Sequence, residues 1–213
     1  MEDLKEMINE FTNALLSVNR AEASAVLDRY YAARKDFACI EEIVSESLRD
    51  IGEGWDKGKV SLSQVYMSGV ICEDLIDGFL PITHTELKTS PRIGIAVLLD
   101  HHSLGKKIVS SIIKSNGYEL IDFGHGLSSD DIVRLAIKHK VDVVLISTLM
   151  LNSALKVKEI KDKLRLTNPD IKIIAGGAPF RLDNKLWQKV GADANGGNAS
   201  DIMNIIGKVV AGK

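Results

Sequence analysis

From residue 92 to the C-terminus, the sequence alternates between two kinds of hydrophobic pattern. Short apolar, β-branched runs typical of buried strands are each followed by a segment with apolar residues at helical spacing. The predicted strands are 92–99, 118–123, 141–147, 171–175 and a short last one at about 192–195. The predicted helices are 106–116, 129–139, 153–166, 182–190 and 199–210. Five strands alternating with five helices predict a parallel sheet covered by helices on both faces.

The simplest topology for this pattern is a flavodoxin-like (Rossmann-like) five-stranded parallel sheet with strand order 2-1-3-4-5. In open sheets of this kind, ligands bind outside the carboxyl ends of the strands, next to the point where the strand order reverses. We therefore expect a binding site where the loops after strands one, three and four meet.

The first 80 residues have a helical pattern throughout. Four apolar stripes predict four short helices, which suggest a small four-helix bundle. The glycine-rich segment 52–61 lies between the third and fourth stripes, and we interpret it as an ordinary helix connection that ends in a plausible N-cap serine. On this interpretation Trp55 belongs to the core.

Residues 81–91 lose all periodicity and are bracketed by prolines, which marks them as a linker. The predicted organisation is a helical domain over 1–80, a linker over 81–91 and an α/β domain over 92–213. A chain of 213 residues is long enough for two modest domains, each with its own core.

The charge balance and the cysteine content indicate which kinds of partner and which cellular compartment to expect. A net charge of −2, with lysine and arginine spread along the chain, indicates neither a nucleic-acid surface nor a polybasic membrane patch. The acidic N-terminus has no secretory signal pattern, and no apolar run is long enough to span a membrane. Cys39 and Cys72 lie in predicted helices, so we expect reduced, packed thiols and a cytoplasmic protein.

The loop after the first predicted strand carries the most reactive side chains. An apolar run breaks there into Asp100-His101-His102-Ser103-Leu104-Gly105. A neutral imidazole can bind a transition metal when its other ring nitrogen donates a proton to an acceptor, and Asp100 could be that acceptor for His102. Taken alone, a histidine near a strand end is more often a surface or hydrogen-bonded structural residue.

Two further loops are expected at the same edge. One begins at Ser147-Thr148-Leu149 and supplies hydroxyls, and the other contains Gly176-Gly177 and supplies backbone without side chains. Each feature has an ordinary structural explanation by itself, such as an N-cap or a tight turn. Together they suit a bulky ligand with a metal at one end and a polar tail slotted into the sheet.

The set Asp100-x-His102-x-x-Gly105, Ser147-x-Leu149 and Gly176-Gly177 resembles the DxHxxG…SxL…GG signature of cobalamin-binding domains. These domains hold the cofactor with its dimethylbenzimidazole displaced and a protein histidine in its place. The helical region before Pro81, the segment 176–179 and Gly191-Ala192-Asp193 make the whole chain similar to two-domain corrinoid proteins of anaerobic methyltransferase systems. Those systems demethylate methylamines, methanol and aryl methyl ethers, and their corrinoid proteins are similar to the cobalamin module of methionine synthase.

The resemblance implies a role for each matching residue. His102 would be the lower axial ligand of cobalt, with Asp100 as its hydrogen-bond partner and Ser153 completing a relay, and these three would be the functional residues. Ser147 would hydrogen-bond the displaced benzimidazole tail. The cofactor-binding set also includes His101 and Ser103, which flank the ligand, and the residues that line the slot: Gly105, Leu149, Gly176 and Gly177. The helical domain would be a cap over the upper cobalt face.

Three features depart from the pattern of the family. His101 stands where an aliphatic residue is usual, and Gly124-His125-Gly126 replaces a segment with an acidic residue, an aliphatic residue and a proline. Leu151-Asn152 stands where threonines are common. None of these departures removes a ligand, and they bear on the methyl donor and on the partner surface.

The resemblance implies a methyl carrier in anaerobic one-carbon metabolism, with cobalamin or a related corrinoid as cofactor. Separate proteins would complete the system: a donor-specific methyltransferase, an acceptor methyltransferase that uses folate or a thiol, and a reductive activator. We expect no stand-alone enzymatic activity, because the chain shows no obvious site for a donor or an acceptor.

Three alternatives remain open at this stage. A cobalamin-dependent sensor usually carries a DNA-binding module ahead of the cap, whereas the helical pattern begins here at residue 2. An adenosylcobalamin mutase subunit normally works with a large substrate barrel. A cobalt-free flavodoxin-like or receiver domain would explain the fold but not the set of loops.

Overall fold

The computed structural model describes residues 4–79 and 88–212, apart from the side chain of residue 56. The chain divides into two compact units, residues 1–81 and 82–213, and each is described by itself. Of the predicted linker, residues 81–87 lie outside the described part. Residues 88–91 already belong to the first strand, because Lys88 pairs with Tyr118 on the neighbouring strand although the residues around it are exposed and polar.

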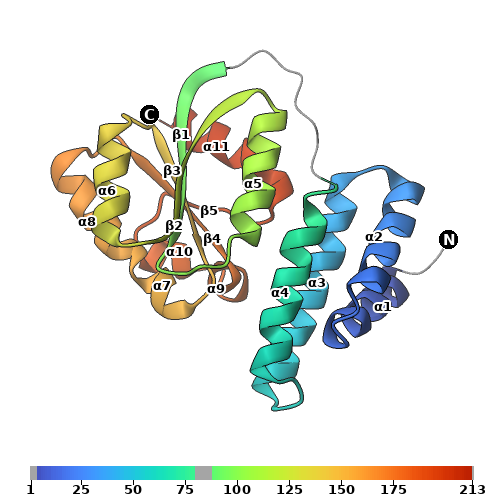
Figure 1. Ribbon diagram of the computed structural model, residues 1–213. Coiled ribbons are helices and arrows are strands. Elements are labelled where there is room, and N and C mark those ends of the chain that lie inside the picture. The colour runs from blue at the N-terminus through green and yellow to red at the C-terminus, as the bar shows by residue number, and fades with distance from the viewer. Residues whose placement is uncertain (1–3, 80–87, 213) are drawn as a thin grey trace. The chain divides into compact units, whose positions relative to one another are not determined.

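The N-terminal unit contains the four predicted helices, which Figure 1 shows in blue to green: α1 Leu4–Leu16, α2 Arg20–Arg34, α3 Phe37–Asp56 and α4 Leu62–Ile76. Short polar side chains begin three of them. Asn19 and Asp36 accept hydrogen bonds from backbone N–H groups of α2 and α3, and Ser61 forms a capping box with Gln64 at the start of α4. Both cysteines are free and buried, as expected, and burial raises the pKa of Cys72 to about 12.

The glycine-rich segment differs from the prediction. Helix α3 continues through Gly54 to residue 56, and the connection to α4 is correspondingly short. Gly54 is suited to this turn, because a Cβ there would lie 2.7 Å from Cγ2 of Val60. The prediction that Trp55 is core is wrong, since its side chain is 44% exposed. Ile51 is the last buried residue among the described side chains of α3, so the bundle core ends one turn before the indole.

The C-terminal unit is a sheet of five parallel strands in the order β2-β1-β3-β4-β5, which confirms the predicted flavodoxin-like topology (Figure 1). The strands are β1 Lys88–Leu98, β2 Tyr118–Leu127, β3 Val143–Thr148, β4 Lys172–Gly177 and β5 Ala194–Asn195. The central strand β1 is fully buried from Ile93 to Leu98, as an apolar run predicts for a strand covered on both faces.

Helices cover both faces of this sheet (Figure 1). Helices α5 Leu104–Ser115 and α11 Ile202–Ala211, with a 3-10 turn at Ala199–Asp201, enclose one apolar core. The other face carries α6 Ser129–Lys138, α7 Leu151–Leu155, α8 Val157–Thr167, α9 Ala178–Leu182 and α10 Leu186–Lys189. The predicted helices 153–166 and 182–190 are therefore each replaced by a pair of shorter helices. Between α9 and α10 the chain is extended at Asp183, whose carboxylate accepts the N–H of Lys185.

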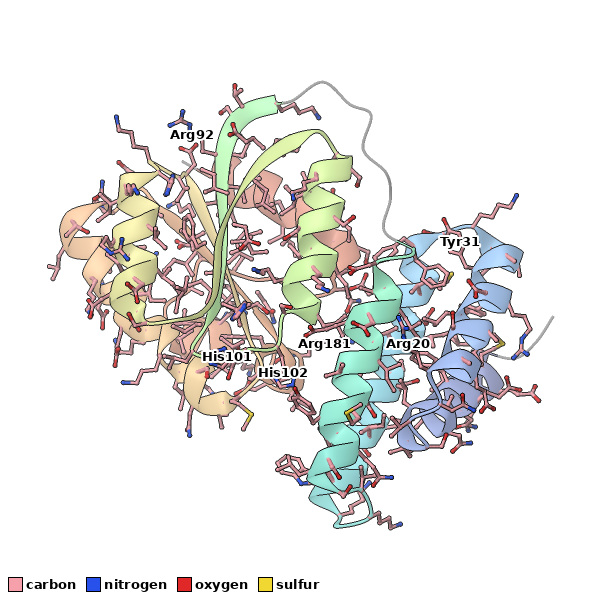
Figure 2. All side chains as sticks on the ribbon, viewed as in Figure 1. Arg20, Tyr31, Arg92, His101, His102 and Arg181 are labelled. Atoms are coloured by element: carbon pink, nitrogen blue, oxygen red, sulfur yellow. The ribbon has the colours of Figure 1, made fainter. Side chains whose placement is uncertain are left out.

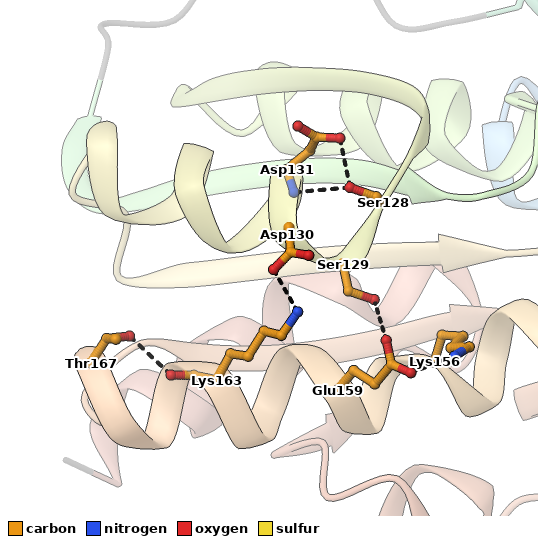
Figure 3. Close-up of polar contacts among 8 residues, drawn as sticks. All are labelled: Ser128, Ser129, Asp130, Asp131, Lys156, Glu159, Lys163 and Thr167. Atoms are coloured by element: carbon orange, nitrogen blue, oxygen red, sulfur yellow. Dashed lines mark hydrogen bonds and ion pairs between the residues drawn. The ribbon is translucent and has the colours of Figure 1, made fainter.

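A polar network joins α6 to α8 beside the sheet (Figure 3). Ser128 caps α6 by accepting the N–H of Asp131 at 3.2 Å, and Ser129 donates to Glu159 of α8 at 3.3 Å. Lys163 pairs with Asp130 across the same two helices. Exposed ion pairs of this kind contribute about 0–1 kcal/mol each, so the network mainly holds the start of α6 in place.

Among the described residues, no helix combines the length and the apolar composition needed to cross a membrane.

Candidate functional site

The strand register brings the three predicted loops together at the carboxyl edge of the sheet. Val97, near the end of β1, pairs with Ser147 of β3, and Ser147 in turn pairs with Gly176 of β4. The loops that follow these strands therefore start side by side. Figure 2 labels His101 and His102 at this edge, next to the end of β1.

Asp100, in the loop after β1, makes the polar contacts to the loop after β3. Its Oδ2 accepts the backbone N–H groups of Leu149 at 2.7 Å and Met150 at 3.2 Å, and its Oδ1 accepts the hydroxyl of Ser153 at 3.0 Å. The carboxylate thus holds the loop after β3 against the loop after β1.

Ser153 lies in this arrangement although only its distance from Ser147 suggested it. Its side chain is 5% exposed and sits within α7, while α8 begins four residues later at Val157 with Lys156 in the N-cap position. Ser153 therefore does not cap the helix that runs to Thr167. Its hydroxyl donates a hydrogen bond to Asp100.

His102 follows Asp100 by two residues and is half-buried just before α5 begins. Ser103 occupies the N-cap position of that helix. Leu99 has a left-handed backbone with φ of 59°, which turns the chain sharply as it leaves β1. The structure therefore brings together Asp100 and Ser153 and places His102 beside them, while a bond from the imidazole to Asp100 stays a prediction.

Glycines lie next to this loop and pack closely around Ser147. A Cβ on Gly105 would sit 3.4 Å from the Ser147 hydroxyl oxygen, and one on Gly176 would sit 3.7 Å from the Cα of Gly196. Glycines thus line both sides of Ser147. Gly196 was not anticipated, and its position in a Gly-Gly pair after the short last strand is the signal that could have found it.

Gly177 has a second, structural reason to be glycine. Its φ is 112°, and a Cβ there would lie 1.8 Å from the carbonyl oxygen of Thr148 on the neighbouring strand. No other residue fits at this position, whether or not a ligand is bound.

Apolar side chains form the rim of the site. Leu149, Met150 and Leu151 are 40%, 53% and 56% exposed, and Leu99 is 45% exposed across the edge. Clustered exposed apolar residues around a polar groove are typical of sites for large, partly apolar ligands.

A charged pair supports the start of α5 and was not anticipated. Lys106, which follows Gly105 and is buried, donates to both carboxylate oxygens of Asp122 on β2 at 2.8 and 2.9 Å. Burial opposes ionisation of Asp122, but the hydrogen bonds from Lys106 and from the N–H of Gly124 outweigh it and hold the pKa of Asp122 below its usual value. Because Lys106 belongs to the first turn of α5, the pair anchors the loop that carries His102.

The signature implies that His101 lies against the cofactor, but its ring contacts another histidine. Its ring lies edge-on to that of His125, near the end of strand β2, with 5.5 Å between the ring centroids. The two Nδ1 atoms are 3.4 Å apart, and both side chains are exposed.

These features define a class: an α/β protein with a histidine loop and clustered glycines at the switch point of its sheet, preceded by a helical bundle. Two family profiles, both described as B12 binding domain, match residues 92–205 and residues 7–77. The chain belongs to the B12 binding domain family, and its cofactor is cobalamin or a related corrinoid.

Relatives and a solved structure match this chain along almost its whole length. Monomethylamine corrinoid protein 1 of Methanosarcina acetivorans is 28% identical over 211 residues, covering 94% of this chain and 96% of the relative. Dimethylamine corrinoid protein 3 of the same organism is 26% identical over 209 residues, covering 95% and 96%. The structure of the Methanosarcina barkeri monomethylamine corrinoid protein has the same fold, with a TM-score of 0.82, 24% identity and coverage of 97% and 100%. The resemblance to two-domain corrinoid proteins is confirmed.

Proposed function

We propose that this protein carries a methyl group on a corrinoid between a donor-specific methyltransferase and an acceptor methyltransferase. The observation that supports this most is that Asp100 joins the loops after β1 and β3, in a chain that matches methylamine corrinoid proteins along nearly its whole length. When bound, the corrinoid supplies a cobalt centre that accepts and releases the methyl group.

The residues at the carboxyl edge fit such a group. The glycines around Ser147 keep side chains away from its hydroxyl, which would bind the polar tail of the cofactor. The apolar rim formed by Leu149 and Met150 suits the edge of a large, flat ring. His102 is the one half-buried imidazole in the loop with Asp100, and we assign it as the lower axial ligand in a base-off, His-on arrangement.

Asp100 would orient that ligand. Its carboxylate is already immobilised by two backbone N–H groups and by Ser153, so it offers a fixed acceptor to the second ring nitrogen of His102. Acceptors of this kind fix the tautomer and raise the basicity of a metal-bound imidazole. Ser153 then acts as a positioning residue, because it reaches the imidazole through Asp100.

The chain would have no methyl-transfer activity without partner proteins, which include a reductive activator. We would test the carrier role with full-length protein that has been reconstituted with cobalamin and reduced. Mixing with a corrinoid-specific methyltransferase and its methyl donor should convert the visible spectrum of the corrinoid in a single turnover. A Ser147→Ala variant, which keeps the axial loop but loses the tail contact, should load less cobalamin and convert proportionally less. No conversion with any methyltransferase of the methylamine, methanol or aryl-ether type would contradict the carrier role.

A further inference from the structure

Two histidines at the carboxyl edge of the sheet meet in space. His101 precedes the proposed ligand, and His125 lies 24 residues further along, near the end of strand β2. Their Nδ1 atoms are 3.4 Å apart. The assignment of His102 as the ligand does not account for this contact between the two rings.

The backbone holds the two rings together from both sides. The N–H of Gly126, next to His125, donates to the carbonyl oxygen of Asp100, next to His101, at 2.8 Å. Gly126 has a φ of 67°, and a Cβ there would lie 2.7 Å from Cε1 of the His101 ring. Glycine at this position is what lets the His101 ring lie against the loop.

The separation of the two nitrogens suits a shared metal ion better than a shared proton. Hydrogen bonds donated by N–H groups usually have donor–acceptor distances of about 2.7–3.2 Å. Two imidazole nitrogens bound at about 2.0–2.1 Å to a tetrahedral ion lie about 3.3–3.4 Å apart. The observed distance of 3.4 Å equals the second value.

The site is open to solvent. Both histidines are exposed, so an ion can reach them without a conformational change. Within residues 4–79 and 88–212, no third histidine, cysteine, aspartate or glutamate completes a metal-binding group with them. Two protein ligands would leave the remaining coordination positions to water.

We propose that His101 and His125 form a two-histidine chelate for a divalent transition metal of the Zn²⁺, Ni²⁺ or Cu²⁺ class, bound through both Nδ1 atoms. Neutral imidazoles are ligands that these ions prefer. A bound ion would tie the loop after β1 to the end of strand β2. It would thereby restrain the loop that carries His102 from the side opposite to the Asp100–Ser153 contact. The proposal does not depend on the carrier function.

Calorimetric titration of the cobalamin-free full-length chain with Zn²⁺ tests this. One ion should bind per chain, and His101→Ala and His125→Ala should each weaken binding by at least about tenfold, because a single imidazole loses the advantage of chelation. The double variant should bind no more tightly than either single variant. Gly126→Ala should also weaken binding, because its methyl group displaces the His101 ring without removing a ligand.

Two matched controls remove other imidazoles. His139, whose ring stacks on Phe123, and His102 should each be replaceable by alanine with less than a twofold change in Zn²⁺ affinity. An unchanged Zn²⁺ affinity in His125→Ala, or a loss of binding in His102→Ala or His139→Ala, would overturn the proposal, as would the absence of Zn²⁺ binding by the unaltered chain.

Discussion

Replacing Asp100 in two ways separates its two roles. Asparagine keeps an oxygen that can accept the N–H groups of Leu149 and Met150, and its amide can donate to the Ser153 hydroxyl in place of accepting from it. Alanine loses all three bonds. Only the carboxylate can accept from the second ring nitrogen of His102 while all three donors are in place.

The expected free energies follow from the exposure of each donor. A hydrogen bond to a charged group contributes about 1.5–3 kcal/mol when it is lost without replacement. Water can reach the N–H groups of the exposed Leu149 and Met150, whereas the Ser153 side chain is 5% exposed and its hydroxyl would be left without this partner. Asp100→Ala should therefore lower the free energy of unfolding by about 2 kcal/mol, and Asp100→Asn by less than about 1 kcal/mol.

Urea unfolding of the cobalamin-free chain measures this difference. Trp187 packs against the core of the α/β unit, and Trp55 is exposed, so a Trp55→Phe background leaves Trp187 as the reporter for the unit that contains the site. Cobalamin affinity is measured in parallel and should fall about 10–100-fold in both variants, since both lose the acceptor for the ligand histidine. Asp130→Asn, which removes an 81% exposed carboxylate from α6, is the matched control and should change neither quantity. Equal stability of the alanine and asparagine variants, or unchanged affinity in Asp100→Asn, would refute the reasoning.

Three further substitutions probe other parts of the structure. Gly177→Ala should destabilise the chain by more than about 3 kcal/mol or prevent folding, because its Cβ would lie 1.8 Å from a neighbouring carbonyl oxygen; a change below 1 kcal/mol in urea unfolding would contradict this. Gly105→Val should weaken cobalamin binding by about tenfold or more by filling the space beside Ser147, with an unfolding midpoint near that of the unaltered chain. The stabilisation by the Lys106–Asp122 pair should be complete above about pH 4, the usual carboxyl pKa, and disappear as the pH falls through the lowered pKa of folded Asp122. The difference in the free energy of unfolding between the unaltered chain and Asp122→Asn should therefore shrink as the pH is lowered. A difference that grows would contradict the lowered pKa of Asp122.

The strand order and the meeting of the loops could be predicted because both follow from the alternation of strands and helices. Parallel strands joined by helical crossovers allow few topologies, and each puts the carboxyl ends on one edge. The two helices that each divide into a pair could not be predicted, because their periodicity continues across the breaks. Trp55 was misplaced for a related reason: a stripe shows which face of a helix is apolar but not where the core beneath it ends.

The polar contacts of the site were harder to predict than its location. The N–H groups that hold Asp100 belong to the backbone of Leu149 and Met150. Because almost every residue type has a backbone N–H, the sequence does not show which ones bind a side chain. The pairs Lys106–Asp122 and His101–His125 join loops or elements more than 15 residues apart, so only the three-dimensional register reveals them. His125 was visible in the sequence as an unusual residue, but its partner was not.

Electron paramagnetic resonance of the Co(II) form of the cobalamin-loaded chain tests the central assignment most directly. Protein labelled with nitrogen-15 histidine should show superhyperfine coupling of cobalt to a single labelled nitrogen. That coupling should persist in His101→Ala and disappear in His102→Ala. Coupling to the benzimidazole nitrogen of the cofactor alone, or loss of the histidine signal in His101→Ala with retention in His102→Ala, would contradict the assignment of His102 as the axial ligand.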